Sequence, residues 1–239
     1  MTEELLDNET HETAAEITKN PFPFVTVVLL VCIATVFAIQ MYVGLERSLL
    51  LAGFSKPAFT IDHQYWRLFT GFVLHGFLLH ILMNGYALYM FGRDFEMLSN
   101  GAHLANVILL SAIAGNILSL VFLPEGLSIG ISGGVVGLIG YLAVYSFRRR
   151  QFISPQYRKS LLINIGFILI FGIVLFNYID NYGHIGGLIA GAIYGFIQIP
   201  GDEYTDPRKA GKVTEICGLF SLVIVAVVSV FAIFKMLVP

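Results

Sequence analysis

Seven long apolar segments with few charges inside them constrain this chain more than any other feature of its sequence. Of the 239 residues, 56% are hydrophobic and only 13% are charged, whereas a soluble domain carries about 25% charged residues. Each segment approaches the roughly 20 residues that a helix needs to cross a bilayer, and none alternates as the strands of a transmembrane barrel do. The sequence therefore predicts an all-α polytopic membrane protein. The segments cover residues 24–42, 68–91, 103–123, 132–147, 161–178, 184–199 and 213–237.

The same pattern divides the chain into four parts. Residues 1–20 are polar and acidic, and because they lack the features of a signal peptide we expect a cytoplasmic tail. Residues 21–199 hold six of the seven segments and are predicted to form the core. Residues 200–212 then form a loop, and residues 213–239 form a seventh transmembrane helix. The net charge of −2 gives no reason to expect a nucleic-acid partner.

Lysine and arginine predict the orientation, because cytoplasmic loops carry an excess of both. With the N-terminus in the cytoplasm, ten of the 14 fall inside and four fall outside. The loop at residues 43–65 then lies outside, and its mixture of leucines and polar residues favours the membrane interface. The absence of a transit-type leader favours a bacterial plasma membrane.

Three of the apolar segments contain polar residues that hydrocarbon normally excludes. The second segment has His75, His80 and Asn84, the fourth begins at Ser132, and the sixth begins at His184. About 16 residues separate Ser132 from the arginines at the cytoplasmic end of its segment. They rise by ~24 Å, against a hydrocarbon core of ~30 Å. Ser132 is therefore expected below the outer surface, and His184, which begins a segment of similar length and direction, at the same level.

Glycines predict that the fourth and sixth segments touch. Small residues spaced by four let helix backbones approach closely in lipid. This contact serves packing by itself, and it also brings His184 to Ser132. The glycines are Gly183, Gly187, Gly191 and Gly195 in one segment, and Gly133, Gly137 and Gly140 in the other.

These residue types suit nucleophilic catalysis. A serine hydroxyl becomes a good nucleophile when a base takes its proton, and a neutral imidazole is the usual base. The backbone N–H groups at the start of the helix of Ser132 favour developing negative charge. His80 and Asn84 share a helix face and can add donors for an oxyanion. Taken singly, His80 and Asn84 can also serve as polar contacts between helices. For His75 we expect a structural role.

At this point the residues resemble the rhomboid family of intramembrane serine proteases, over about residues 21–199. The family's motifs are Trp-Arg, His-x-x-x-Asn, Gly-x-Ser-Gly, a final His-x-x-Gly-x-x-x-Gly, and Gly-x-x-x-Glu at the inner end of the second span. They match Trp66-Arg67, His80 to Asn84, Gly130-Ile131-Ser132-Gly133, His184 with Gly187 and Gly191, and Gly92 with Glu96.

The resemblance implies a six-helix rhomboid-like core plus one C-terminal helix, and the activity of a serine endopeptidase. Ser132 and His184 would form a dyad without an acidic third member. His80, Asn84 and the Ser132 N–H would stabilise the oxyanion, and Gly130 would shape the loop. Neither a metal nor an organic cofactor would be needed.

The resemblance also implies partners and a gate. Substrates would be single-pass membrane proteins whose helix tops unwind in the site, with membrane lipid around the protein. The fifth span would be mobile, and its Phe167, Phe171 and Phe176 would seal the site laterally.

One position departs from the family pattern. Many relatives carry a tyrosine four residues after the nucleophile, stacked on the catalytic histidine, and here this position is Val136. Tyr141 lies elsewhere on the helix. Asp180 and Asn181 precede His184 in the predicted outer loop, and we do not expect Asp180 to act as the third member of a triad.

Two other functions stay open. The first is a catalytically inactive rhomboid-like protein that binds membrane clients; such proteins usually lack the serine or the histidine, and both are present here. The second is a transporter or a metal site built from His75, His80 and His184, since zinc accepts histidine ligands. Against the metal site, the five-residue spacing of His75 and His80 predicts different faces of one helix.

Overall fold

The computed structural model describes residues 22–174, 179–202 and 204–238 as a bundle of helices. Two short strands, β1 (Phe54–Ser55) and β2 (Leu127–Ser128), pair antiparallel. The predicted all-α fold is confirmed, whereas the tail predicted at residues 1–20 lies outside the described residues. The helices are α2 (Phe24–Val43), α3 (Leu45–Ala52), α4 (Lys56–Thr60), α5 (Arg67–Thr70), the 3-10 helix η1 (Gly71–Val73), α6 (Leu78–Leu98), α7 (Gly101–Phe122), α8 (Ser132–Arg148), α9 (Pro155–Val174), α10 (Asn181–Gln198) and α11 (Lys212–Leu237).

Each of the seven predicted segments overlaps one long helix. Four of these, α2, α7, α9 and α11, are long and apolar enough to cross a membrane alone. The bent pair formed by α5–η1 and α6 meets the same criteria only when its two parts are taken together. The helices α8 and α10 are shorter, with 17 and 18 residues. The helix α8 begins at Ser132, and α10 begins three residues before His184.

The second predicted segment is wrong at its start, because the chain breaks between Val73 and Leu78 and bends by 87°. His75 lies in this break rather than on α6. Its N–H donates to Gln40 Oε1 (2.9 Å) and its carbonyl accepts from Gln40 Nε2 (3.1 Å). Because the Gln40 amide pairs both backbone groups, the chain can leave the helix at this buried position without an unpaired His75 N–H or carbonyl.

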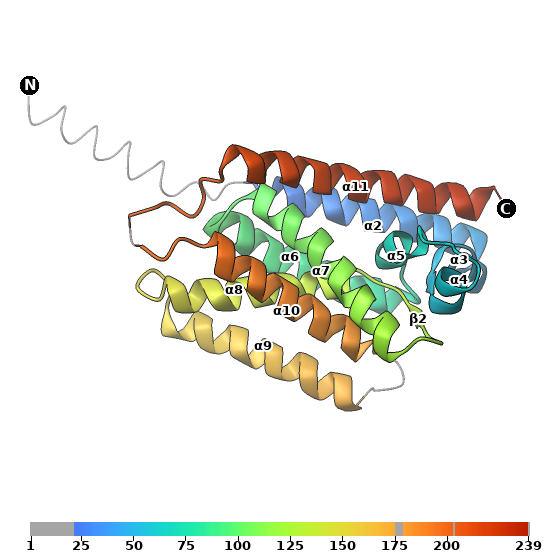
Figure 1. Cartoon of the computed structure of the whole chain (residues 1–239), viewed down its shortest axis with the longest axis horizontal. Coiled ribbons are helices and arrows are strands. Elements are labelled where there is room, and N and C mark those ends of the chain that lie inside the picture. Colours follow the sequence, from blue (N-terminus) through green and yellow to red (C-terminus); the bar gives the residue numbers. More distant parts are fainter. Residues whose placement is uncertain (1–21, 175–178, 203, 239) are drawn as a thin grey trace, which may run out of the picture.

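Figure 1 shows where α10 lies in the bundle. This helix packs against α7 and α8, while α11 packs against α2 and α7. The helix α9 lies along one edge of the bundle beside α8, and α3, α4 and α5 gather at one end (Figure 1). The edge position of α9 leaves much of its apolar surface exposed.

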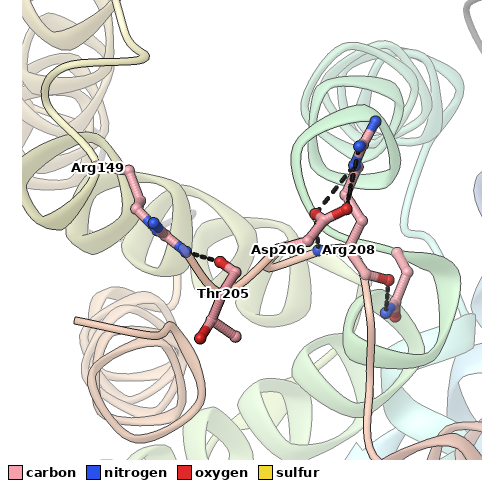
Figure 2. Close-up of polar contacts among 5 residues, drawn as sticks. Arg149, Thr205, Asp206 and Arg208 are labelled. Carbon is pink, nitrogen blue, oxygen red and sulfur yellow. Dashed lines mark hydrogen bonds and ion pairs between the residues drawn. The ribbon is translucent and has the colours of Figure 1, made fainter. Parts of the chain in front are cut away.

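The connection from α10 to α11 is fixed at the other end of the bundle. Figure 2 shows Arg149, at the end of α8, donating to the Thr205 carbonyl and Arg208 paired with Asp206 (3.0 Å). Arg149 is itself buried and donates to a second carbonyl of this loop, that of Asp202. The seventh helix is therefore tied to the core through its connecting loop.

The C-terminal end of α6 is tied to the start of α2. Glu96 accepts from Thr26 N–H (2.8 Å), Thr26 Oγ1 (2.6 Å) and Val25 N–H (3.2 Å). These N–H groups belong to the first turn of α2 and have no partner within the helix. A side chain on Gly92 would collide with Thr26. The two residues of the Gly-x-x-x-Glu motif thus serve one helix contact.

The contact between α8 and α10 depends on glycine. A Cβ on Gly187 would collide with the Gly133 carbonyl, and a Cβ on Gly191 with the Gly137 carbonyl. On the other helix, a Cβ on Gly140 would collide with the Leu188 carbonyl. The predicted glycine contact between the two helices is confirmed.

We expect Gly191→Ala to destabilise the fold by about 1–3 kcal/mol, because the added methyl meets a backbone carbonyl that cannot move without moving α8. Gly166→Ala is the matched control, since a Cβ there meets nothing within 4 Å and alanine favours helix by up to ~1 kcal/mol. Thermal unfolding of both purified variants in detergent checks this. Equal melting temperatures would show that the contact is not tight.

Candidate functional site

The loop before Ser132 is held from two sides. Ser128, in β2, pairs with Phe54 of β1, and the Gly130 N–H donates to the Gly71 carbonyl (3.0 Å). Gly130 has a φ of 103°, a conformation that glycine adopts without strain. Ser132 then begins α8. The first loop of the chain thereby fixes the height and direction at which Ser132 starts its helix.

Two polar side chains of α6 border this loop. A Cβ on Gly130 would lie 2.8 Å from His80 Nε2 and 3.3 Å from Asn84 Nδ2. The Gly76 N–H donates to His80 Nδ1 (3.4 Å), so the proton of the neutral ring lies on Nε2, facing the loop. Asn84 Nδ2 is buried and has no hydrogen-bond partner among the described residues. Two N–H donors therefore meet beside Gly130.

His75 and His80 are neighbours, contrary to the prediction that they occupy different faces of one helix. Their rings meet edge to face with centroids 5.0 Å apart, because His75 lies in the break before α6. His75 is fully buried, and neither of its ring nitrogens has a hydrogen-bond partner in the described parts of the chain. Within those parts, no three His, Cys, Asp or Glu side chains gather as a metal site would need.

His184 is the fourth residue of α10 and is positioned through the backbone. Its N–H donates to the Asp180 carbonyl (3.1 Å). Its Nδ1 is buried and without a hydrogen-bond partner among residues that the structure describes. Val136 lines the same cavity as the His184 ring, whereas Tyr141 is distant, with its hydroxyl 2.9 Å from Ser99 Oγ. Tyr141 thus does not replace the family's tyrosine.

Two cavities meet at Ser132 and His184. The larger has a volume of about 330 Å³ and is walled by α6, α8 and α9; Asn84 also lines it. Its other walls are largely apolar and include Phe167 and Phe171 of α9, whereas Phe176 lies outside the described residues. The smaller cavity has about 20 Å³, room for about one water molecule. The two side chains share both cavities, although no hydrogen bond joins them in this structure.

The Trp-Arg pair, Trp66-Arg67, fixes the loop that carries β1. The Arg67 guanidinium donates to the carbonyls of Gly53 (2.7 Å) and Leu50 (3.0 Å) and to Gln64 Oε1 (2.6 Å). The Trp66 ring packs against Phe231 of α11, with ring centroids 5.5 Å apart. Arg67 thus holds the backbone of the loop that carries β1, and Trp66 attaches this region to the seventh helix, α11.

Three residues near the site were not singled out by sequence reasoning. Gln40, Ser128 and Lys56 form no motif, and only the amide of Gln40 in an apolar segment and the charge of Lys56 mark them. Lys56 is buried; burial lowers the pKa of its ammonium, and the negative charge of Asp180 raises the pKa in part. The two opposite charges therefore lie within electrostatic reach of each other.

Comparison with known proteins agrees with this geometry. The chain matches the Rhomboid domain over residues 62–201. The chain belongs to the rhomboid family. It is 32% identical over 139 residues to RHOMBOID-like protein 6, mitochondrial, of Arabidopsis thaliana, which covers 57% of this chain and 45% of that protein. It is also 32% identical over 142 residues to Inactive rhomboid protein 1 of Homo sapiens, covering 59% of this chain and 16% of that protein.

The matched region covers less than half the length of either relative. The region of this rhomboid that matches the Rhomboid domain runs from α5 to α10 and includes Ser132, His184, His80 and Asn84. The apolar helices and the family together make the chain a multi-pass membrane protein. One of the named relatives is inactive by its name, so family membership alone does not decide whether this rhomboid cleaves peptide bonds.

We expect Gly130→Ala to cost more stability than Gly44→Ala. Both glycines have φ near +100°, so both variants carry similar backbone strain. The methyl at position 44 meets nothing within 4 Å, whereas that at position 130 meets His80 and Asn84. The clash should add about 1–3 kcal/mol, which parallel unfolding curves measure. Equal losses would place His80 and Asn84 away from the loop.

Proposed function

We propose that this rhomboid is an intramembrane serine endopeptidase in which Ser132 is the nucleophile and His184 is the base. The observation that supports this most directly is that both side chains line the same two cavities. The N–H donors of His80 and Asn84 border the loop that precedes Ser132, which is where an oxyanion would need them.

The proposed reaction follows from these positions. Ser132 Oγ attacks the carbonyl carbon of a substrate peptide bond while His184 takes the hydroxyl proton. His184 then gives this proton to the leaving amine, and a water molecule, deprotonated by the same ring, releases the acyl group. Negative charge on the carbonyl oxygen faces His80 Nε2, Asn84 Nδ2 and the Ser132 N–H at the start of α8. No step uses a metal or a cofactor.

The shape of the larger cavity supports a membrane-protein substrate. Its apolar walls on α6, α8 and α9 suit an unwound transmembrane segment better than a charged peptide, because burying unpaired charge is costly. The side chains of Phe167 and Phe171 line this cavity and are about half exposed. We propose that single-pass membrane proteins, with lipid around them, enter between α6 and α9 as α9 moves aside.

Topology and domain limits belong to the same proposal. The distribution of lysine and arginine supports a cytoplasmic N-terminus and a site that opens to the outside. The apolar segments and the motifs support a catalytic core at residues 21–199. Residues 200–212 and 213–239 would then be a cytoplasmic loop and an added helix. A bacterial plasma membrane stays a prediction, since the relatives named above are eukaryotic.

Ser132→Ala should lower cleavage of a reconstituted transmembrane substrate by at least about 10³-fold, because no other group replaces the nucleophile. Ser146→Ala is the matched control: it lies on the same helix, is buried, and bonds only the Ala143 carbonyl. Gel analysis of the cleaved substrate measures both variants. Equal cleavage by Ser132→Ala and the wild type would exclude Ser132 as nucleophile.

Asn84→Ala should lower kcat by about 10²-fold with little change in KM, because an oxyanion donor acts mainly in the transition state. Steady-state kinetics in detergent micelles separates the two constants. A loss confined to KM would instead assign Asn84 to substrate binding.

A second candidate is a client-binding protein without protease activity. It is favoured by the inactive relative, by Val136 beside His184, and by the lack of a hydrogen bond between Ser132 and His184 in this structure. A fluorophosphonate probe separates the candidates, because it labels only an activated serine. Labelling of the wild type but not of Ser132→Ala supports the protease; client binding without labelling or cleavage supports the inactive protein.

A further inference from the structure

Asp180 contacts both halves of the candidate site. Its Oδ1 accepts from the N–H of Gly183, three residues later (2.8 Å), and this bond caps the start of α10. Its Oδ2 accepts from the Ser128 hydroxyl, four residues before Ser132. Its backbone carbonyl accepts from the His184 N–H. One residue therefore joins the first turn of the helix of His184 to the loop that leads into Ser132.

Ser128 is well placed to hold the other end of this link. It is 4% exposed, it is fixed in the β1–β2 pair, and its Oγ lies 3.1 Å from Ser119 Oγ. A hydroxyl has one proton to donate and two lone pairs. Because Ser128 donates to Asp180, it accepts from Ser119, so the link continues into α7.

The His184 ring lacks other support. Its Nδ1 has no hydrogen-bond partner among the described residues, and Val136 offers no ring to stack on it. The position of the ring therefore depends on where α10 begins. A misplacement of about 1 Å can cost 10²-fold in rate, so whatever fixes the start of α10 bears directly on catalysis.

We propose that Asp180 is a positioning residue, which holds the start of α10 against the Ser128 loop so that His184 faces Ser132. This inference rests on the proposed protease function. Asp180 is not the third member of a triad, because that residue would bond His184 Nδ1, and both Asp180 oxygens are engaged by Gly183 and Ser128.

The test compares kcat and KM for Asp180→Ala, Ser128→Ala and the double variant. We expect Asp180→Ala to lower kcat by about 10- to 10²-fold with KM nearly unchanged. Ser128→Ala, which keeps the helix cap, should lower kcat less and should add nothing to Asp180→Ala. Asp180→Asn should recover most of the rate, because its amide can still contact Gly183 and Ser128.

Asn100→Ala is the matched control for a purely structural cap. Asn100 caps α7 through the His103 N–H (2.9 Å), as Asp180 caps α10, but it touches neither Ser132 nor His184. We expect this variant to lower the melting temperature and to keep kcat. An equal fall in kcat for Asn100→Ala and Asp180→Ala would overturn the proposal, as would an Asp180→Asn variant as slow as the alanine variant.

The order of measurements separates this inference from the proposed function. The wild type is first labelled with the fluorophosphonate probe, with Ser132→Ala as the blank, and an unlabelled wild type refutes the protease itself. With a labelled, cleaving wild type, an unchanged kcat in Asp180→Ala refutes the positioning role alone. If Asp180→Ala does not fold, Ser128→Ala decides, because an unchanged kcat there means that the link does not matter.

Discussion

The backbone contact between α8 and α10 is the constraint on which the rest of the structure depends. Lipid provides no hydrophobic drive for helices to associate, so close van der Waals packing must supply it. The glycine pairs Gly187 with Gly133 and Gly191 with Gly137 place helix backbone directly on helix backbone. Two helices packed this closely hold a fixed register, and each carries one of the candidate catalytic residues in its first turn. The level of Ser132 relative to His184 is thus a property of the helix pair before any side-chain contact is made.

The first loop of the chain sets the remaining geometry from outside the bundle. The β1–β2 pair and the Gly71 carbonyl bind the backbone of the loop before Ser132. The Arg67 guanidinium binds the backbone of the loop that carries β1. Asp180 adds a link from the opposite side. In contrast, the reactive side chains themselves make few hydrogen bonds. The site is therefore held mainly by its backbone, while the Ser132 and His184 side chains line the two cavities without a hydrogen bond between them.

The sequence predicts features that depend on periodicity or composition within one segment. It does not predict features that depend on contacts between distant segments. Apolar length identifies the seven long helices, and four-residue glycine spacing identifies the α8–α10 contact, because both are local properties of one segment. The break at His75 depends instead on the amide of Gln40, 35 residues earlier, and the residues around His75 do not predict it. The same holds for the two-residue strands and for the Ser128–Asp180 bond, whose partners are 52 residues apart. The motifs could place Ser132 and His184 in one site, but not show what supports each of them.

Binding and cleavage impose different demands on this architecture. To hold an unwound membrane segment, the protein needs only the apolar cavity between α6, α8 and α9. To cut that segment, it also needs the Ser132 hydroxyl, a base at His184 and donors beside Gly130. These requirements fall on different residues, so a rhomboid can lose the second set and keep the first, which is consistent with a family that contains a relative named as inactive. Fold alone does not decide the function of such a chain. In this rhomboid both sets of residues are present. Whether it cleaves or only binds a membrane segment therefore depends on whether the start of α10 brings the His184 ring within reach of Ser132.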